Sequence, residues 1–193
     1  LGANRYLVEL ALASDDFELA RQRYNAVLEY HPDHLPTLLG LARLDGREQD
    51  EESMVKRLQQ AHTAHPTSPE PVFLLGSYYF AAGYPERVES LIQPLGSLQK
   101  KSPQIQLLLA MAYLSRQETA EKAQYTLEQL IDLSPDKSAY HHLLAMAAAS
   151  VGDKTEMKAG LIKAVELNPE SLPSLIALAK LARIEGESEE FQQ

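Results

Sequence analysis

The sequence contains no cysteine in its 193 residues, which excludes disulfides, thiolate nucleophiles and zinc sites with cysteine ligands. Tryptophan is also absent, and aromatic residues make up only 7% of the chain. A folded core must therefore be built mainly from leucine and alanine, which favours helices. The longest uninterrupted apolar run, residues 107–114, is far too short to span a bilayer, and no signal peptide is visible.

Basic residues are also scarce. The chain has 18 lysines and arginines against 27 aspartates and glutamates, which gives a net charge of −9. A surface of this sign repels phosphate backbones unless a local basic strip overrides it. The nearest candidate, Lys100-Lys101, reads as a pair of cations at a helix end. We therefore expect no nucleic-acid partner.

Prolines divide the chain into units of similar length. They are Pro32, Pro66, Pro103, Pro135 and Pro169, separated by 34, 37, 32 and 34 residues. Each follows a run whose apolar residues recur every three or four positions, which is the helical pattern. Because proline has no N–H and disfavours helix in the residue before it, each proline closes one helix and can open the next. The spacing predicts a repeat of helix pairs.

Small residues recur at fixed places inside these units. Gly76 and Tyr79 in the third unit correspond to Ala110 and Tyr113 in the fourth. Only glycine or alanine lets two backbones approach where helices cross, while larger residues pack around the crossing. Gly152 follows a predicted first helix, where glycine supplies the left-handed cap that turns the chain back.

This set of positions resembles the tetratricopeptide-repeat (TPR) family, whose unit of about 34 residues carries Leu-Gly, Tyr, Ala, a large apolar residue, Ala and Pro in that order. The resemblance covers the whole chain. It implies an all-α TPR solenoid, a right-handed superhelix of antiparallel helix pairs with about eleven helices. Four positions depart from the pattern: Asp45 stands where the first-helix tyrosine belongs, and Met54, Val88 and Met157 replace the second-helix alanine.

The repeat register predicts a single array over residues 1–193. Hairpins are expected at about 1–34, 35–68, 69–103, 104–137 and 138–171, with a partial sixth at 172–193. The last first helix should cover 172–186, and a new helix should begin after Gly186. Pro94-Leu95-Gly96 predicts a kink or break near Gln93. Because the chain starts and stops on helical patterns, we expect it to be a fragment of a longer protein.

The sequence carries no motif for catalysis or for a cofactor. Four histidines (His31, His34, His62 and His65) lie at predicted helix ends without a third converging ligand, so we expect no metal site. Acidic clusters at 15–16, 50–52 and 187–190 fall at predicted starts of second helices, where negative charge complements the helix dipole. A glycine-rich phosphate loop is absent. We therefore expect no catalytic residues, no cofactor and no enzymatic activity.

The resemblance implies a concave groove lined by one stripe of each first helix. The partner-binding residues that we expect on this stripe are Leu39, Arg43, Phe73, Ser77, Phe80, Met111, His142, Met146 and Lys180. Relatives that grip a terminal carboxylate use lysines and asparagines on the first three first helices, and that set is incomplete here. The middle of the stripe is apolar, which is typical of a partner site. The competing interpretation is that these residues pack under neighbouring helices.

The favoured function is a scaffold that binds a protein or peptide in its groove. Three segments, 35–44, 71–80 and 161–170, are similar to those of bacterial TPR lipoproteins of exopolysaccharide and PEP-CTERM sorting systems. That resemblance implies a lipid-anchored periplasmic protein in polymer export or sorting, and the absence of cysteine suits an oxidising compartment. The alternatives are a substrate-recruiting arm of a larger enzyme, a cytoplasmic adaptor and an architectural spacer.

Overall fold

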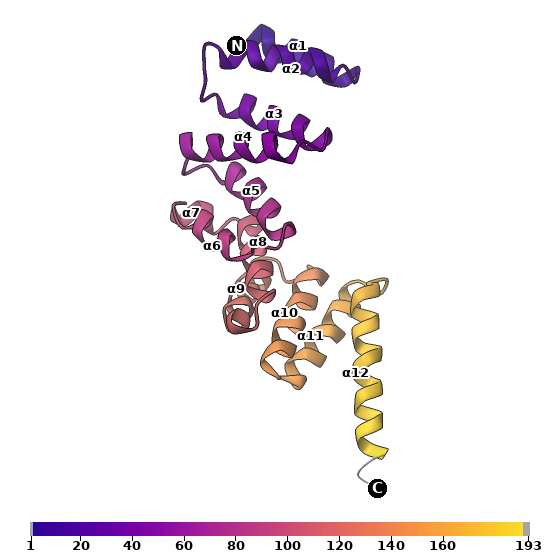
Figure 1. Ribbon diagram of the computed structural model, residues 1–193. Coiled ribbons are helices and arrows are strands. Elements are labelled where there is room, and N and C mark those ends of the chain that lie inside the picture. Colours follow the sequence, from indigo (N-terminus) through magenta and orange to yellow (C-terminus); the bar gives the residue numbers. More distant parts are fainter. Residues whose placement is uncertain (1, 191–193) are drawn as a thin grey trace. The chain divides into compact units, whose positions relative to one another are not determined.

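The computed structural model describes residues 2–190 of the chain (Figure 1). That range contains twelve α-helices and one short 3₁₀ helix, and it contains no β-strand. The predicted all-α class and the architecture of helix pairs are confirmed. The helices are α1 (Gly2–Ala13), α2 (Phe17–Leu28), α3 (Leu35–Arg47), α4 (Glu51–Ala64), α5 (Pro69–Ala81), α6 (Glu86–Ile92), α7 (Ser97–Lys100), α8 (Pro103–Leu114), η1 (Gln117–Thr119), α9 (Ala120–Leu133), α10 (Ser138–Val151), α11 (Lys154–Leu167) and α12 (Leu172–Glu190).

The chain forms two compact units, Leu1–Ala82 with Ser90–Lys100, and Gly83–Glu89 with Lys101–Gln193. The first unit holds the pairs α1–α2 and α3–α4, followed by α5, and the second holds the pairs α8–α9 and α10–α11, followed by α12. Within each pair the two helices pack side by side (Figure 1). A pair does not cover its own apolar face, so α3 packs on α2, α5 on α4, α10 on α9 and α12 on α11.

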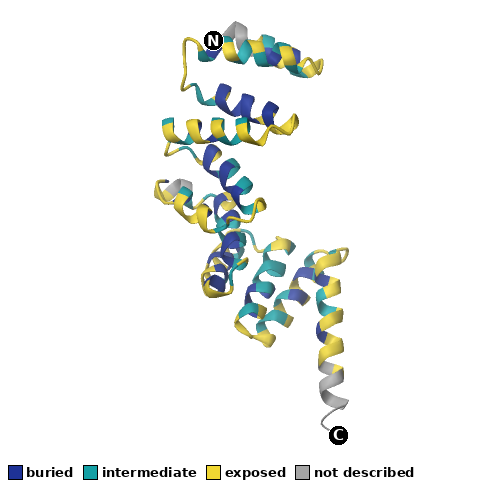
Figure 2. Ribbon diagram, in the orientation of Figure 1, coloured by how far each residue is buried: buried dark blue, intermediate teal, exposed yellow. Residues whose placement is uncertain are grey.

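Leucine and alanine dominate the core, as the composition predicts. In the first unit a buried cluster contains Leu38, Leu75 and Tyr79, and in the second unit a cluster contains Ala110 and Leu127. Burial is heaviest on α3, where eight of the thirteen residues are buried (Figure 2). This helix is covered on two sides because it lies between α4 of its own pair and α2 of the preceding pair, and α10 lies in the same way between α11 and α9.

The turns after α1, α3, α5 and α10 share one backbone feature. Asp15, Gln49, Gly83 and Gly152 have positive φ values of 56°, 62°, 83° and 85°. A residue in the left-handed conformation ends a helix and redirects the chain, at a steric cost that glycine avoids. The predicted glycine cap is confirmed at Gly152, while Asp15 and Gln49 show that other residues occupy the equivalent position.

An aspartate follows the left-handed residue in three of these turns and caps the second helix. The carboxylates of Asp16, Asp50 and Asp153 each accept a hydrogen bond from the backbone N–H three residues further on, at 2.9–3.0 Å. These bonds satisfy amide groups that have no partner inside the helix. The hydrogen bond from Ser53 lowers the pKa of Asp50 below its usual value. The acidic clusters at 15–16 and 50–52 therefore lie where the sequence predicted.

The end of the chain differs from the prediction. No new helix begins after Gly186, because α12 runs without interruption from Leu172 to Glu190, so the acidic cluster at 187–190 lies inside a helix and not at the start of one. Helix propagation adds one hydrogen bond for each residue. Within the described residues no second helix packs back on α12, so nothing offsets that gain at Gly186.

The predicted break near Gln93 is confirmed. Helix α6 ends at Ile92 and the four-residue α7 begins at Ser97, so the second helix of the third pair is two short pieces. Pro94 lacks an N–H and its ring excludes continuation of the helix. Ile92 and Leu95 are both buried, at 5% and 3% exposure, so the break keeps apolar side chains on the core.

Asp45, which departs from the repeat pattern, has a structural role that the sequence did not reveal. Its side chain is 1% exposed, and its two carboxylate oxygens accept hydrogen bonds from Arg21 Nη1 and Arg57 Nε, both at 2.6 Å. Arg21 belongs to α2 and Arg57 to α4, so one buried carboxylate joins three helices. The hydrogen bond to Asp45 is also the main cause that raises the pKa of Arg21. A buried anion is tolerated here because both oxygens are paired.

Replacing Asp45 with alanine should lower the free energy of unfolding by roughly 3 kcal/mol, because it leaves the partly buried Arg57 without its anion and Arg21 with only the exposed Glu48. Arg43→Ala is the control, since it removes an ion pair with Glu70 whose side chains are 61% and 50% exposed and which is worth less than about 1 kcal/mol. Urea unfolding followed by circular dichroism measures both. Equal losses for the two variants would contradict the structural role of Asp45.

Candidate functional site

The predicted partner-binding residues occupy equivalent places on the first helices. They lie five, nine and twelve residues after the N-cap, which is His34 for α3, Ser68 for α5, Ser102 for α8 and Lys137 for α10. We call these positions the first-helix stripe. The same register places Ile176 and Lys180 on α12. Because the two units are separate bodies, the stripe is described in each of them.

In the first unit the stripe offers a partly exposed apolar surface on α5. Phe73, Ser77 and Phe80 are partly exposed, whereas their neighbours in α5 include several buried residues. Arg43 is exposed, and its Nη2 donates to Glu70 Oε1 at 2.5 Å. Leu39 differs from the expectation: it is 2% exposed and packs in the core cluster of α3, α4 and α5. It therefore has no surface to offer a partner, because α3 is covered on both sides.

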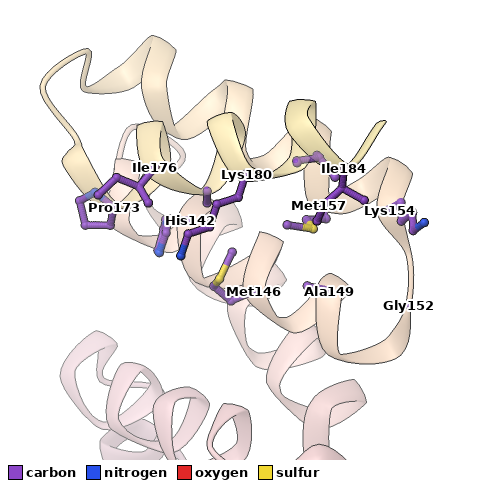
Figure 3. A pocket seen from close by; sticks show the side chains of 12 residues that line it. His142, Met146, Ala149, Gly152, Lys154, Met157, Pro173, Ile176, Lys180 and Ile184 are labelled. Carbon is purple, nitrogen blue, oxygen red and sulfur yellow. The ribbon is translucent and has the colours of Figure 1, made fainter. Parts of the chain in front are cut away.

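In the second unit the structure brings three of the predicted residues together. His142 and Met146 on α10 and Lys180 on α12 line one hollow of about 540 Å³ (Figure 3). Met111, on α8, is partly exposed and does not line it. The residues around the hollow are His142, Met146, Ala149, Gly152, Lys154, Met157, Pro173, Ile176, Ala177, Lys180, Leu181 and Ile184. The volume lies within the range of about 300–1,000 Å³ that is usual for ligand sites.

The stripe residue at the hollow is smaller than its equivalent in the preceding pair. Twelve residues after the N-cap, α8 carries Leu114 and α10 carries only Ala149. Leu114 packs against a cluster that contains Ala123, whereas Ala149 lines the hollow together with Met157. The order of sizes is thus reversed between the two pairs. In α8–α9 the first helix carries the large residue, Leu114, and the second carries Ala123, whereas in α10–α11 the first helix carries Ala149 and the second carries Met157.

The same exchange of sizes occurs in the first unit. Leu12 packs with the cluster of Ala20 in α1–α2, and in α3–α4 a Cβ placed on Gly46 would lie 3.0 Å from the sulfur of Met54. Met54 therefore covers a position that has no side chain. Met157 is the equivalent residue of α11, four residues after its N-cap Asp153 as Met54 is four after Asp50.

The hollow has an apolar floor and a basic rim. Lys154 and Lys180 are both exposed, and no acidic residue is among those that line it. In Figure 3 His142 and Lys180 are seen toward one end of the hollow, while Lys154 is at the opposite end beyond Met157 and Ile184. The two lysine charges are therefore separated along the hollow.

His142 connects α10 with α12 at the edge of this site. Its Nδ1 lies 3.0 Å from Ser174 Oγ, and Ser174 Oγ lies 2.9 Å from Ser171 Oγ. Ser174 is fully buried. Burial lowers the pKa of His142 below its usual 6.5, which favours the neutral imidazole at neutral pH. The ring is thus a polar but uncharged part of the rim.

Some lining residues were not predicted as site residues. Ala149 and Lys154 carried no signal of their own, because an alanine and a lysine on a helix are ordinary. Met157 was visible only as a departure from the second-helix alanine. The signal that could have identified Ala149 and Met157 was the size exchange between paired helices, which requires the register of both helices at once.

Neither a metal site nor a membrane span is found in the described part of the chain. Residues 2–190 contain no group of three or more histidine, aspartate and glutamate side chains able to hold a metal ion. His141, next to His142 in sequence, has its Nε2 2.8 Å from the carbonyl oxygen of Pro135, so the two rings do not serve one site. Over the same residues, every helix is too short or too polar to cross a membrane.

Comparisons with known proteins agree on the repeat. Residues 104–137 match the family model described as tetratricopeptide repeat. The structure is similar to that of a MamA protein at 21% identity, over 88% of this chain and 92% of that chain, with a TM-score of 0.74. It is also similar to YrrB, described as a TPR protein with an unusual peptide-binding site, at 14% identity over 88% and 87% of the two chains, with a TM-score of 0.76.

A thermophilic TPR protein of Thermus thermophilus is similar at 19% identity, over 94% of this chain and 98% of that chain, with a TM-score of 0.61. No curated protein sequence matches the chain. At these identities the likeness concerns the fold.

Lowering the pH from about 7.5 to about 5.5 should destabilise the protein through two histidines. Burial lowers the pKa values of His62 and His142 below 6.5, so the unfolded chain binds protons more readily than the folded one. Their contribution to stability is complete above pH 6.5 and is lost as the pH falls through the lowered values. As the pH is lowered, the urea midpoint of the double variant His62→Gln, His142→Gln should fall less than that of the parent. An equal fall of the two midpoints would contradict the role of these histidines.

Proposed function

We propose that the chain, which has the fold of tetratricopeptide-repeat proteins and matches the repeat model over residues 104–137, is an interaction scaffold that holds a peptide or an extended protein segment on the first-helix stripe. In this proposal it is not an enzyme. The fold supplies a row of equivalent helices, and the function depends on which side chains the stripe presents.

The observation that carries the proposal is the hollow at the stripe between α10 and α12. His142, Met146 and Lys180 were selected from the repeat register alone, and all three line it. An accessible apolar depression with a few polar groups at its rim is typical of a binding site. Methionine side chains at such a surface adapt to the shape of a ligand.

The similarity to YrrB supports the same proposal. That protein is described as having an unusual peptide-binding site, and it shares the fold with this chain. The ligand is not expected to be a free terminal carboxylate held by a set of lysines and asparagines. The corresponding places in the first unit hold Arg43, Phe73 and Ser77, and the guanidinium of Arg43 is already paired with Glu70.

The scaffold proposal can be tested by affinity capture with the purified protein, followed by mass spectrometry. The paired variant Phe73→Asp, Phe80→Asp and the variant Met146→Asp should each lose most of the recovered partner, because a charge replaces a partly exposed apolar residue of the stripe. Tyr30→Asp is the control, since Tyr30 is 79% exposed and lies off the stripe. Recovery that is the same for all four proteins would contradict a binding role of the stripe.

We also propose that this scaffold works outside the cytoplasm in bacterial exopolysaccharide export or protein sorting. The support is the similarity of segments 35–44, 71–80 and 161–170 to those of TPR lipoproteins. Fractionation of native cells with an antibody against the chain should recover the protein in the extracytoplasmic, membrane-associated fraction. Recovery in the cytoplasm would favour the cytoplasmic adaptor, and a catalytic domain on the same polypeptide would favour the enzyme arm.

A further inference from the structure

We propose that the hollow between α10 and α12 binds a large apolar side chain of an acidic peptide segment, with a carboxylate on each side of that side chain. The inference rests on the proposed scaffold function and names the ligand class for this part of the stripe. It is carried by three observations: the apolar floor, the separated lysines and the absence of acidic residues from the lining.

The floor of the hollow is built for an apolar group. Met146 and Met157 approach it from α10 and α11, and Ile176 and Ile184 from α12 (Figure 3). Ile176 is 45% exposed and Ile184 is 47% exposed, so a ligand that covers these side chains removes apolar surface from contact with water. Burial of that surface is the favourable term for an apolar anchor.

The rim is electrostatically opposite to the rest of the protein. The chain carries a net charge of −9, yet the charged residues that line the hollow are Lys154 and Lys180. A basic site on an acidic protein selects acidic ligands locally, while the net charge repels acidic ligands elsewhere. The hollow therefore discriminates by charge as well as by fit.

The positions of the two lysines distinguish a peptide from a lipid. Lys180 lies with His142 toward one end of the hollow, and Lys154 lies at the other. A fatty acid has one carboxylate at one end of its chain and can pair with only one of these ammonium groups. A peptide segment with acidic residues before and after an apolar residue can pair with both, which is why we commit to the peptide.

Fluorescence anisotropy with three labelled, end-capped peptides tests the ligand class. The first peptide contains Asp-Glu-Leu-Phe-Glu-Asp; the second has serine in place of Leu and Phe; the third has lysine in place of each acidic residue. We expect the 193-residue chain to bind the first at least about tenfold more tightly than the second, since burial of one large apolar side chain is worth about this factor or more. It should also bind the first more tightly than the third, because Lys154 and Lys180 repel the lysines of that peptide.

Methionine NMR locates the binding. The chain has only four methionines, so methyl-labelled protein gives four signals. Addition of the first peptide should shift the signals of Met146 and Met157, which line the hollow. Met54, in the other unit, should not shift and serves as the internal reference.

Matched variants test the floor and the rim separately. Ile176→Ser should weaken binding of the first peptide by about tenfold, whereas Leu175→Ser should not, because Leu175 is 39% exposed on the same helix but does not line the hollow. Lys180→Glu should weaken binding of the acidic peptide and strengthen binding of the lysine peptide. Lys158 is exposed on α11 outside the hollow, so Lys158→Glu makes the same change in net charge without that reversal.

The outcomes separate this inference from the scaffold function. If the lysine peptide binds as tightly as the acidic one and shifts Met146 and Met157, the ligand class is wrong and the scaffold proposal stands. If decanoate shifts these two signals and the acidic peptide does not, the site is for a lipid and the inference is overturned. If no probe shifts them, the inference fails, and the affinity capture with the α5 variants decides the scaffold proposal independently.

Discussion

Close approach of paired helices is the constraint from which the architecture follows. Each of the second helices α2, α4, α9 and α11 carries a fully buried alanine, and Ala20, Ala61, Ala123 and Ala164 are all 0% exposed. A side chain larger than a methyl group would separate the backbones at these points. The larger apolar residues are therefore displaced to the sides of each pair, where only the next helix can cover them. Burial in each unit is consequently shared between neighbours, and no pair is stable on its own account.

Most of the fold could be predicted because the repeat is marked by prolines, which have a strong local effect on where helices end. Proline spacing located the helix ends, and the conflict between Pro94 and a continuous helix located the break after Ile92. Two features could not be predicted. Asp45 looked like a poor substitute for tyrosine, because its arginine partners come from two other helices. The end of α12 was misplaced because a glycine alone does not end a helix unless the following segment packs back.

The site was predicted in part, and for a reason that sets a limit on sequence reading. The register identified which residues share the first-helix stripe, and this placed His142, Met146 and Lys180 on one surface. The repeat register does not predict how deeply each of these side chains is buried, however. Leu39 occupies the same stripe but lies in the core, and the hollow is lined by Ala149 and Met157, which belong to two different helices. The side-chain volumes of two packed helices can be compared only once it is known which residues face each other.

The exchange of large and small residues between paired helices has an evolutionary consequence. Leu114 with Ala123 gives a filled surface, whereas Ala149 with Met157 gives a cavity floored by a flexible thioether. Two substitutions in one hairpin would therefore reshape the stripe surface of that hairpin. Because each pair contacts only its neighbours, such a change would leave distant repeats unaffected. A scaffold of this kind can acquire new partners one hairpin at a time, and its duplicated repeats can diverge in ligand without diverging in fold.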